Sequence, residues 1–465
     1  MSPVLCCIEV PPSLLSGIVW RTKARISDGR PFDAHEDIYH FALDAMSGFT
    51  FGHGFNFGTT LPTTEAISGM DTTAQKALRS TGTKEDPLSF PHGKLPDVMW
   101  AFMELTELVA YLLGNPFPHL TWAYVLRKPA SKKAYQIKED YIQGELKQAV
   151  QRLSEGGAEK PSSAVDYIVS REKAMTEKEG RKPDFFSRMI VDEVFGIVYT
   201  GHETTGTMLS WAMKYLADTP GAQSQLRQAL HTRFADARAA GRNPTVQEIT
   251  SNQIPWLEAT IEESLRCSAT APTIDRVAKV DTQILGYRIP KGVVVSQPCS
   301  GPSITTPAFD IDEAMRSPTS LVARRDGDLV PSNWPREGIS VWNPERWLVR
   351  GSSGQLEFNP KAGPQVAFGL GTRGCYGKRL TYVESRIWIT LLVWNFEFLP
   401  LGAPDLAVYC QDDNGQRAER LLRSSARVEC KGCGLVQNSR TCAKVLTVLF
   451  SINSIDHQVS YMPRL

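Results

Sequence analysis

The chain has 465 residues, of which 42% are hydrophobic and 22% charged, so it is long enough to bury a substantial core. Its 51 Lys and Arg balance 50 Asp and Glu, and this near-neutral charge provides no global basic field for nucleic acid or an anionic membrane. Nine cysteines in so long a chain do not form the dense framework of a small secreted protein, which favours a reducing compartment.

The N-terminal segment, residues 1–21, has an apolar character that is soon interrupted. Glu9, Pro11 and Pro12 occur before the ~18 to 20 apolar residues that a membrane span needs. The segment also lacks the basic start and the small-residue cleavage site of a secretory signal. We therefore expect no transmembrane span in this chain and an intracellular protein.

Helical patterns dominate the first third of the chain. Residues 37–50 and 95–113 carry apolar residues at helical spacing and are expected to be buried, whereas 131–154 reads as a long charged surface helix. Residues 59–94 are rich in Thr, Ser, Gly and Pro. This composition predicts an extended surface loop.

The longest periodic segment is 185–216, whose apolar first half predicts a helix that crosses the core and stops before Pro220. Residues 246–266 carry another helical pattern. Residues 286–295 (GYRIPKGVVV) combine a turn with a β-branched run suited to a strand. The chain contains no internal repeat. These patterns predict a mainly α fold with a small β region.

The candidate chemistry lies in residues 368–377 (FGLGTRGCYG), where Cys375 is enclosed by four glycines and one arginine just before a helical pattern that begins near Lys378. Glycines let the backbone approach a flat cofactor, and amide donors hold the charge of a thiolate that ligates iron. An isolated intracellular cysteine is usually a small buried hydrophobe. The spacing of this loop favours a metal ligand instead.

The residues that fit the pattern F-x-x-G-x-R-x-C-x-G are Phe368, Gly371, Arg373, Cys375 and Gly377. This pattern resembles the haem-binding loop of the cytochromes P-450. The resemblance implies the cytochrome P-450 fold, haem b as cofactor and dioxygen as co-substrate. It also implies that Cys375 is the axial thiolate ligand of the haem iron, that Phe368 packs beside it, that Arg373 reaches a haem propionate, and that Gly377 borders the cofactor.

A second match to the same family lies in the predicted helix 185–216, where the sequence reads Thr-Gly-His-Glu-Thr-Thr from Thr200. It resembles the oxygen-activation motif A/G-G-x-D/E-T-T, although a threonine stands at the first position. The resemblance implies that Gly201 opens the helix beside the haem and that Glu203 and Thr204 pass protons to dioxygen. The alternative is that the hydroxyls bond to the preceding turn and the acid faces solvent.

A third match is E-x-x-R at Glu263 and Arg266, whose spacing places the acid and the base on one helix face. Trp-Asn-Pro-Glu-Arg-Trp follows at 342–347. By resemblance, Arg346 joins the pair in a structural triad, and Arg276 stands where the family often has another propionate partner. The alternative for the pair is an exposed ion pair worth less than ~1 kcal/mol.

The resemblance extends from about Ile18 to Phe398. Full-length eukaryotic relatives carry a membrane anchor, a first sheet and a W-x-x-x-R helix, whereas Trp20 is followed by Ala24 at the place of the arginine. We therefore interpret residues 1–398 as a haem domain without that anchor and sheet, and 399–465 as an atypical extension.

Two further segments depart from the common pattern. Residues 300–340 are longer than this stretch usually is, as in fungal members that modify secondary metabolites. Cys430 and Cys433 form a single C-x-x-C with Cys442 nearby, which without a second pair is a weak indication of zinc.

Together these motifs predict a haem-thiolate monooxygenase that hydroxylates or epoxidises a lipophilic small molecule, such as a terpenoid, polyketide or alkaloid intermediate of secondary metabolism. Electrons would come from an NADPH-dependent flavoprotein reductase, because no G-x-G-x-x-G here is followed by a ribose-binding acid. The candidate pocket segments are 95–113, 195–199, 269–274 and the chain after Phe398. The family resemblance implies the cytosolic face of the endoplasmic reticulum.

Two alternatives to a monooxygenase remain. The first is a truncated haem-binding protein without turnover. The second is a haem-thiolate isomerase or dehydratase, which the Glu203–Thr204 pair argues against, because such enzymes have no need to deliver protons to dioxygen.

Overall fold

The computed structural model describes residues 18–52, 54–83, 86–112, 115, 117–155, 161–268, 270, 273–284, 286–299, 302–307, 312–318, 321–322, 338–363, 365–369 and 371–398, and the backbone of 405–411 and 417–423. These residues form two compact units, one that ends at Thr207 and one that begins at Met208. The possible C-x-x-C site lies outside the described residues. Within the described part, no helix is both long and apolar enough to span a bilayer.

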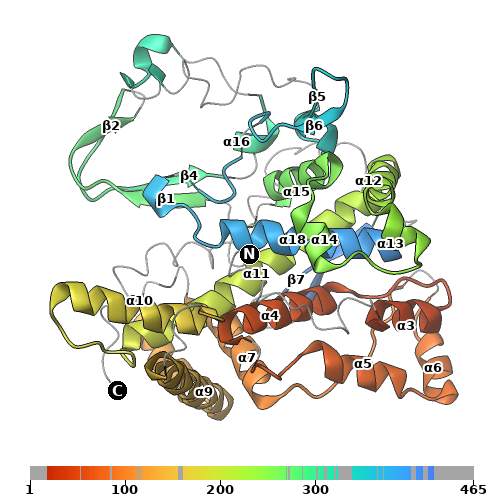
Figure 1. Ribbon diagram of the computed structural model, residues 1–465, viewed down its shortest axis with the longest axis horizontal. Helices are drawn as coiled ribbons and strands as arrows, with labels where there is room; N and C mark the ends of the chain where they lie inside the picture. Colours follow the sequence, from red (N-terminus) through yellow and green to blue (C-terminus); the bar gives the residue numbers. More distant parts are fainter. Residues whose placement is uncertain are drawn as a thin grey trace. The chain divides into compact units, whose positions relative to one another are not determined.

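The first unit is helical (Figure 1). Its helices are α3 (Ile18–Ser27), α4 (His35–Phe51), α5 (Thr60–Ser68), α6 (Thr72–Arg79), α7 (Asp97–Leu112), α8 (Pro118–Val125), α9 (Pro129–Ser154), α10 (Ala164–Glu179) and the first part of α11 (Arg188–Asp218). The helices predicted near 37–50, 95–113, 131–154 and 185–216 are confirmed, and their ends differ by a few residues.

The core of the first unit lies where α9 packs between α7 and α10. Buried residues of α9 recur every three or four positions, which forms one face of the helix. Ile142, Leu146 and Ala149 of this face join Met99 and Phe102 of α7 in one hydrophobic cluster. The opposite face of α9 is charged, so the predicted amphipathic helix is confirmed.

The expectation of an extended loop over residues 59–94 is wrong, because α5 and α6 lie within it. The Asp44 carboxylate on α4 accepts hydrogen bonds from the backbone N–H and hydroxyl groups of both Thr59 and Thr60 at 2.7–3.1 Å, and these bonds hold the start of α5. Asp71 caps α6 by accepting from the Ala74 N–H at 2.7 Å. The polar residues that resembled a loop therefore begin helices.

The second unit contains the rest of α11 and a second set of helices. These are α12 (Pro220–Arg233), α13 (Ala235–Ala239), α14 (Val246–Ser251), α15 (Pro255–Ser268), α16 (Pro302–Thr305) and α18 (Lys378–Asn395), with short 3-10 turns η2 (Glu313–Met315), η3 (Pro344–Trp347) and η4 (Gly371–Arg373). Figure 1 shows α15 beside α18, and the two helices pack against each other. Every residue from 256 to 266 in α15 is buried.

The predicted helix over 246–266 is in fact two helices. Thr245 and Glu248 form a capping box at the start of α14, which ends at Ser251. Pro255 then begins α15, because proline has no N–H to give the preceding turn but fits the first turn of a new helix.

Four two-stranded antiparallel ribbons make up the β structure of the described chain. They pair β1 (Thr273–Val277) with β4 (Val294–Pro298), β2 (Thr282–Ile284) with β3 (Tyr287–Ile289), β5 (Leu348–Arg350) with β6 (Leu356–Phe358), and β7 (Asp405–Gln411) with β8 (Arg417–Arg423). The turn predicted at Gly286 is confirmed by its left-handed φ of +84°, but the single strand expected after it is divided between β3 and β4. The mainly α fold with a small β region is confirmed.

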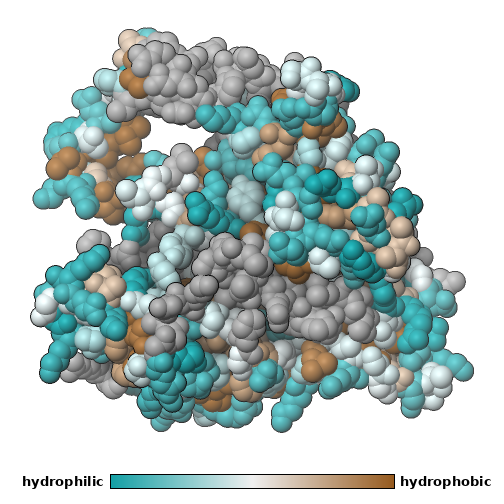
Figure 2. Space-filling model, viewed as in Figure 1, coloured by the Kyte–Doolittle hydropathy of each residue, from teal (hydrophilic) through white to brown (hydrophobic). Residues whose placement is uncertain are grey.

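The first two ribbons expose apolar side chains to solvent, visible as brown atoms near β1 and β2 in Figure 2. Val277, Val280 and Val294 are between 58% and 67% exposed, and Tyr287 is 77% exposed.

Candidate functional site

The cysteine loop of the second unit is shaped by its own backbone. The Cys375 N–H donates to the Phe368 carbonyl at 2.7 Å, and the Gly374 N–H donates to the Gly371 carbonyl at 3.0 Å. Gly369 and Gly371 have φ values of +62° and +69°, a conformation that other residues rarely adopt. These bonds turn the chain so that Cys375 lies directly before α18.

The Cys375 sulfur faces the N-terminus of α18. The backbone N–H groups of Gly377 and Lys378 donate to it, and the amide dipoles there favour a negative charge. Desolvation nonetheless raises the pKa of the Cys375 thiol, while the two amides and the Lys378 ammonium oppose this rise. Cys375 as a residue is exposed. An accessible sulfur with two amide donors is a donor set that suits a haem iron, which would stabilise the thiolate form on binding.

The other predicted residues of the loop lie around this cysteine. Phe368 stacks in a tilted arrangement on Tyr382 of α18, with ring centroids 5.5 Å apart, and the Lys378 Nζ lies 5.7 Å from the centre of the Phe368 ring. Arg373 is half-buried in η4, and Gly377 is the N-cap of α18. Tyr382 and Lys378 were not predicted, since nothing in the sequence distinguishes them from ordinary helix residues.

Arg276 lies on β1, and a neighbouring residue of the same strand contacts the cysteine loop. Its Nη1 donates to the Asp275 carbonyl at 2.8 Å, and the side chain is half-buried. The Cδ1 of Ile274, two residues earlier, lies only 3.4 Å from where a Cβ on Gly369 would be. β1 and the cysteine loop are therefore in contact at that glycine.

The structure brings Glu263 and Arg266 together in a buried bidentate pair. The Arg266 Nε and Nη2 atoms each donate to one Glu263 oxygen at 2.7 Å, and both side chains are fully buried. The alternative of an exposed ion pair is therefore wrong. The Arg346 Nε lies 3.4 Å from Glu263 Oε1, an ion-pair contact that is not aligned as a hydrogen bond.

Two residues that sequence reasoning missed complete the hydrogen bonding of Glu263. The Trp347 indole N–H donates to its Oε2 at 2.9 Å, and the Asn343 backbone N–H donates to its Oε1 at 2.9 Å. Both residues belong to the Trp-Asn-Pro-Glu-Arg-Trp segment at 342–347. The sequence motif therefore indicated the right segment, but the spacing of its residues does not reveal which atoms reach the Glu263 carboxylate.

The Thr-Gly-His-Glu-Thr-Thr motif lies on α11 in the first unit. A Cβ on Gly201 would come within 2.3–2.8 Å of three atoms of Met46, so any larger residue where α4 meets α11 requires Met46 to move. The Thr204 hydroxyl donates to the Thr200 carbonyl at 2.9 Å, which is the bond to the preceding turn that the alternative predicted. The Glu203 side chain is 30% exposed and its Oε1 lies 3.4 Å from His202 Nε2.

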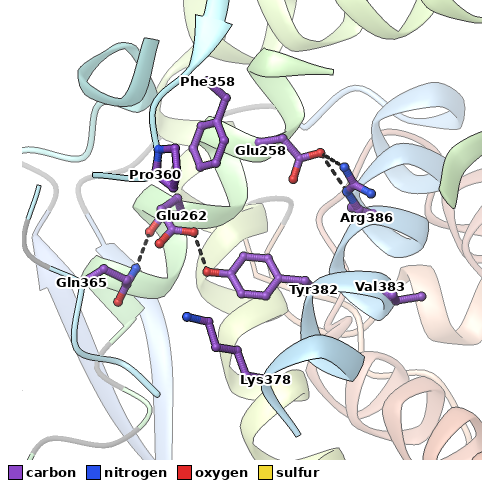
Figure 3. A pocket seen from close by; sticks show the side chains of 9 residues that line it. All are labelled: Glu258, Glu262, Phe358, Pro360, Gln365, Lys378, Tyr382, Val383 and Arg386. Carbon is purple, nitrogen blue, oxygen red and sulfur yellow. Dashed lines mark hydrogen bonds and ion pairs between the residues drawn. The ribbon is translucent and has the colours of Figure 1, made fainter. Parts of the chain in front are cut away.

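A cavity of about 430 Å³ lies in the second unit beside the cysteine loop (Figure 3). Its carboxylates are already paired: Arg386 donates to Glu258 at 2.7 Å, and the Tyr382 hydroxyl donates to Glu262 at 2.6 Å. Burial raises the pKa of both carboxyls. The lining residues are Glu258, Glu262, Phe358, Pro360, Gln365, Lys378, Tyr382, Val383 and Arg386. This polar lining does not suit a lipophilic substrate.

Comparisons with known proteins agree with these motifs. A sequence model of the family described as Cytochrome P450 matches residues 19–301 and 340–408. The segment between the two matched parts nearly coincides with the stretch of 300–340 interpreted above as longer than usual.

Three of the more similar relatives are fungal proteins named as monooxygenases. Cytochrome P450 monooxygenase TRI13 of Fusarium sporotrichioides is 41% identical over 82% of this chain and 67% of the relative. Cytochrome P450 monooxygenase GME11363 of Pestalotiopsis microspora is 31% identical over 90% of this chain and 73% of the relative. For xilC of Penicillium crustosum these figures are 33%, 82% and 64%, so the chain spans roughly two thirds of the length of such relatives. The chain therefore belongs to the cytochrome P450 family, as an oxidoreductase of the haem-thiolate monooxygenase class.

Proposed function

We propose that this cytochrome P450 hydroxylates or epoxidises a lipophilic small molecule in fungal secondary metabolism. The observation that carries the proposal is Cys375, held at the start of α18 with two amide N–H groups on its sulfur. The relatives above are named monooxygenases, which favours turnover over a haem-binding protein without activity. A further relative, from Dothistroma septosporum, is named as a monooxygenase of the Hps1-dma1 cluster, which supports a pathway of clustered genes.

We assign the cofactor contacts residue by residue. Cys375 would ligate the haem iron through its thiolate, Phe368 would cover the sulfur, Arg373 and Arg276 would pair with the propionates, and Gly377 would leave the backbone room beside the cofactor. When bound, the haem supplies the activation of dioxygen and the transfer of one oxygen atom, with electrons from NADPH through a reductase.

The acid and the alcohol of α11 are proposed to deliver protons. Glu203 is partly exposed and can exchange protons with its surroundings. The Thr204 hydroxyl hydrogen points to the Thr200 carbonyl, so its oxygen lone pairs are available to accept a hydrogen bond. Gly201 keeps α11 close to α4, which fixes the part of the helix that carries both residues.

The structural triad is proposed to hold the segment that precedes the cysteine loop. Glu263 forms ion pairs with Arg266 of its own helix and with Arg346 of η3.

The partner that supplies electrons is proposed to be an NADPH-dependent flavoprotein reductase on the cytosolic face of the endoplasmic reticulum. The substrate pocket is proposed to be lined by residues 95–113, 195–199 and 269–274 and by the chain after Phe398. We place the haem domain at 1–398, followed by an extension at 399–465.

The first experiment is the carbon monoxide difference spectrum of the reduced protein. We expect a Soret band near ~450 nm, which is absent from Cys375→Ala and retained in Cys299→Ala, a buried cysteine of the same unit. A band near ~420 nm, or no haem at all in the parent protein, would contradict thiolate ligation. Conversion of a panel of terpenoids, polyketides and alkaloids with a reductase then tests the substrate class.

A further inference from the structure

In the first unit, α4 contacts α11 on both sides of the proposed proton-delivery pair. One contact is at Gly201. The other is at Gly206, where three ring atoms of Tyr39 lie 3.2–3.3 Å from the position that a Cβ would take. Glu203 and Thr204 lie between the two glycines. The geometry of this stretch of α11 therefore depends on side chains of α4.

The hydroxyl of Tyr39 reaches the same turn of α11. It lies 2.6 Å from the Thr207 Oγ1, a contact across 168 positions of the chain. The Thr207 hydroxyl has one hydrogen, which it donates to the Glu203 carbonyl at 2.8 Å, because a carbonyl can only accept. Tyr39 is therefore the donor in the first bond and Thr207 the acceptor. A continuous chain of hydrogen bonds thus joins α4 to the backbone of Glu203.

The Tyr39 phenol is restrained in both position and protonation. Its ring contacts the ring of His35 at the start of α4, with centroids 4.6 Å apart and planes inclined at 48°. Together with the contact at Gly206, this leaves the phenol little room to turn. Burial raises the pKa of Tyr39, the Glu203 charge raises it further, and the bond to Thr207 opposes this rise. The hydroxyl therefore keeps its hydrogen, and its role as a donor, near neutral pH.

The turn that Tyr39 reaches is one where α11 is locally adjustable. A threonine hydroxyl that donates to the carbonyl four residues earlier competes with the helical N–H and often bends the helix. Three such bonds follow one another here, from Thr200, Thr204 and Thr207, at 2.8–2.9 Å. The third of them, on the Glu203 carbonyl, is joined to α4 through Tyr39. How far this turn opens is therefore set from outside α11.

We propose that Tyr39 is a positioning residue for proton delivery: through Thr207 it fixes the turn of α11 that carries Glu203 and Thr204. This inference rests on the proposed role of that pair and adds the residue of α4 that sets its geometry. Tyr39 itself transfers no proton.

The expected consequence is a loss of proton delivery with the haem site intact. Proton transfer needs donor and acceptor within hydrogen-bond reach, and a displacement of about 1 Å can lower a rate about a hundredfold. Without the Tyr39 hydroxyl, the turn at Glu203 can relax, and the acid and the alcohol then deliver protons more slowly. Cys375 lies on a different element and should be unaffected.

The test uses Tyr39→Phe and Thr207→Val in holoenzyme supplied with a reductase. Each substitution keeps the shape of the side chain and removes one partner of the 2.6 Å bond. Without substrate, two electrons and two protons convert dioxygen to hydrogen peroxide, whereas four of each yield two waters. We expect both variants to form water about three- to tenfold more slowly and to release more peroxide per NADPH. Thr207→Ser keeps the hydroxyl and should match the parent.

Tyr215→Phe is the matched control for a purely structural effect. Tyr215 is a half-buried residue of α11 beyond the motif, and its hydroxyl donates to the Cys267 carbonyl at 3.1 Å. The variant loses the same atom and one hydrogen bond, so its stability should fall about as much as that of Tyr39→Phe. Its ratio of water to peroxide should stay that of the parent. An equal rise of peroxide in Tyr215→Phe would mean that general loosening of α11 explains the effect and would overturn the proposal.

Glu203→Gln separates this inference from the proposed function. Peroxide should rise in this variant at least as much as in Tyr39→Phe, because an amide cannot supply a carboxyl proton. A rise in Glu203→Gln with none in Tyr39→Phe overturns the positioning role alone, and no rise in either overturns the role of the acid as well. The ~450 nm band must persist in Tyr39→Phe, and its loss would contradict the proposal. Iodosylbenzene donates an oxygen atom without protons, so oxidation of styrene with it should be unchanged, and an equal fall would also contradict it.

A measurement that does not depend on turnover checks the geometry. Amide hydrogen exchange over residues 203–207 should be several-fold faster in Tyr39→Phe and Thr207→Val than in the parent, because the turn opens more often. Tyr215→Phe should leave the exchange of this turn unchanged. Parent-like protection of residues 203–207 in Tyr39→Phe would show that the phenol does not hold the turn and would overturn the assignment.

Discussion

At the scale of single residues, the Glu263 carboxylate shows how a buried charge depends on its partners. Both of its oxygens accept hydrogen bonds, and Arg266 beside it is fully buried. A buried ion pair contributes little relative to an apolar replacement, but removing one member leaves the other charge without compensation.

Glu263→Gln should therefore lower the free energy of unfolding by about 3–5 kcal/mol and reduce haem content. The matched control is Glu193→Gln, which breaks a half-exposed pair with Arg171 and should lower it by less than ~1 kcal/mol. Urea denaturation followed by fluorescence measures both. Similar losses in the two variants would contradict the argument.

The role of Gly201 depends on how little room its neighbours leave for a side chain. Three Met46 atoms lie within 2.3–2.8 Å of the position that a Cβ would take, including Cγ near the base of the side chain. Gly201→Ala should destabilise the protein by about 1–3 kcal/mol, because the Met46 side chain must leave its packed position between α4 and α11. Thermal unfolding measures this loss.

The control for Gly201 lies on the same helix. Gly196 has no atom within 4 Å of its would-be Cβ, so Gly196→Ala should be neutral or stabilise by up to ~1 kcal/mol. Met46→Ala should restore part of the stability lost in Gly201→Ala. If both glycine variants behave alike, helix propensity rather than packing governs Gly201.

At the scale of elements, the short helix α14 is stabilised by the Glu248 carboxylate in its first turn. Glu248 accepts from the Thr245 N–H at 2.7 Å and pairs with Arg242 at 2.8 Å. These contacts, the Arg242 hydrogen bonds first, lower the pKa of Glu248 from 4.5 to about 2. A lowered carboxyl pKa means that the unfolded chain binds the proton more readily than the folded one.

The stabilisation by Glu248 should thus be complete above pH 4.5 and be lost as the pH falls toward 2. Because the carboxyl is one third exposed, solvent screens the effect and we expect it to be small. Amide hydrogen exchange over residues 246–251 should accelerate relative to the intrinsic rate on acidification in the parent protein and not in Glu248→Gln. The same acceleration in both would contradict the assignment.

The elements also show what sequence patterns can and cannot reveal. Long amphipathic segments such as α9 and α11 were predictable, because their periodicity persists over many turns. α5 and α6 were missed because Thr59 and Asp71 are polar whether they precede a helix or line a loop. Only the distant Asp44 carboxylate distinguishes the two cases at the start of α5.

The site was predictable to a similar degree. The Cys375 loop and the E-x-x-R pair have fixed spacing, so the sequence alone pointed to them. The Trp347 indole on Glu263 is a contact across 84 positions, which no local pattern encodes. Long-range contacts, rather than motif positions, thus contain most of what the structure adds.

At the scale of the whole molecule, the chain combines near-neutral charge with exposed apolar side chains. Its formal net charge is +1 at pH 7, and charge far from zero is what keeps proteins apart in solution. The first two ribbons and the bend between them expose Val277, Val280 and Tyr287. Exposed apolar patches on a protein of low net charge favour self-association.

Val280→Glu should therefore raise the concentration at which the purified protein begins to aggregate near neutral pH, because it removes an apolar contact and adds a charge. Gln283→Glu adds the same charge three residues further along, on β2, where the residue is already polar and exposed, and should raise that concentration less. Light scattering against protein concentration measures both, and the ~450 nm band should be unchanged in each. If the two variants raise the aggregation concentration equally, net charge alone limits solubility. If neither variant differs from the parent, the exposed valines do not drive association.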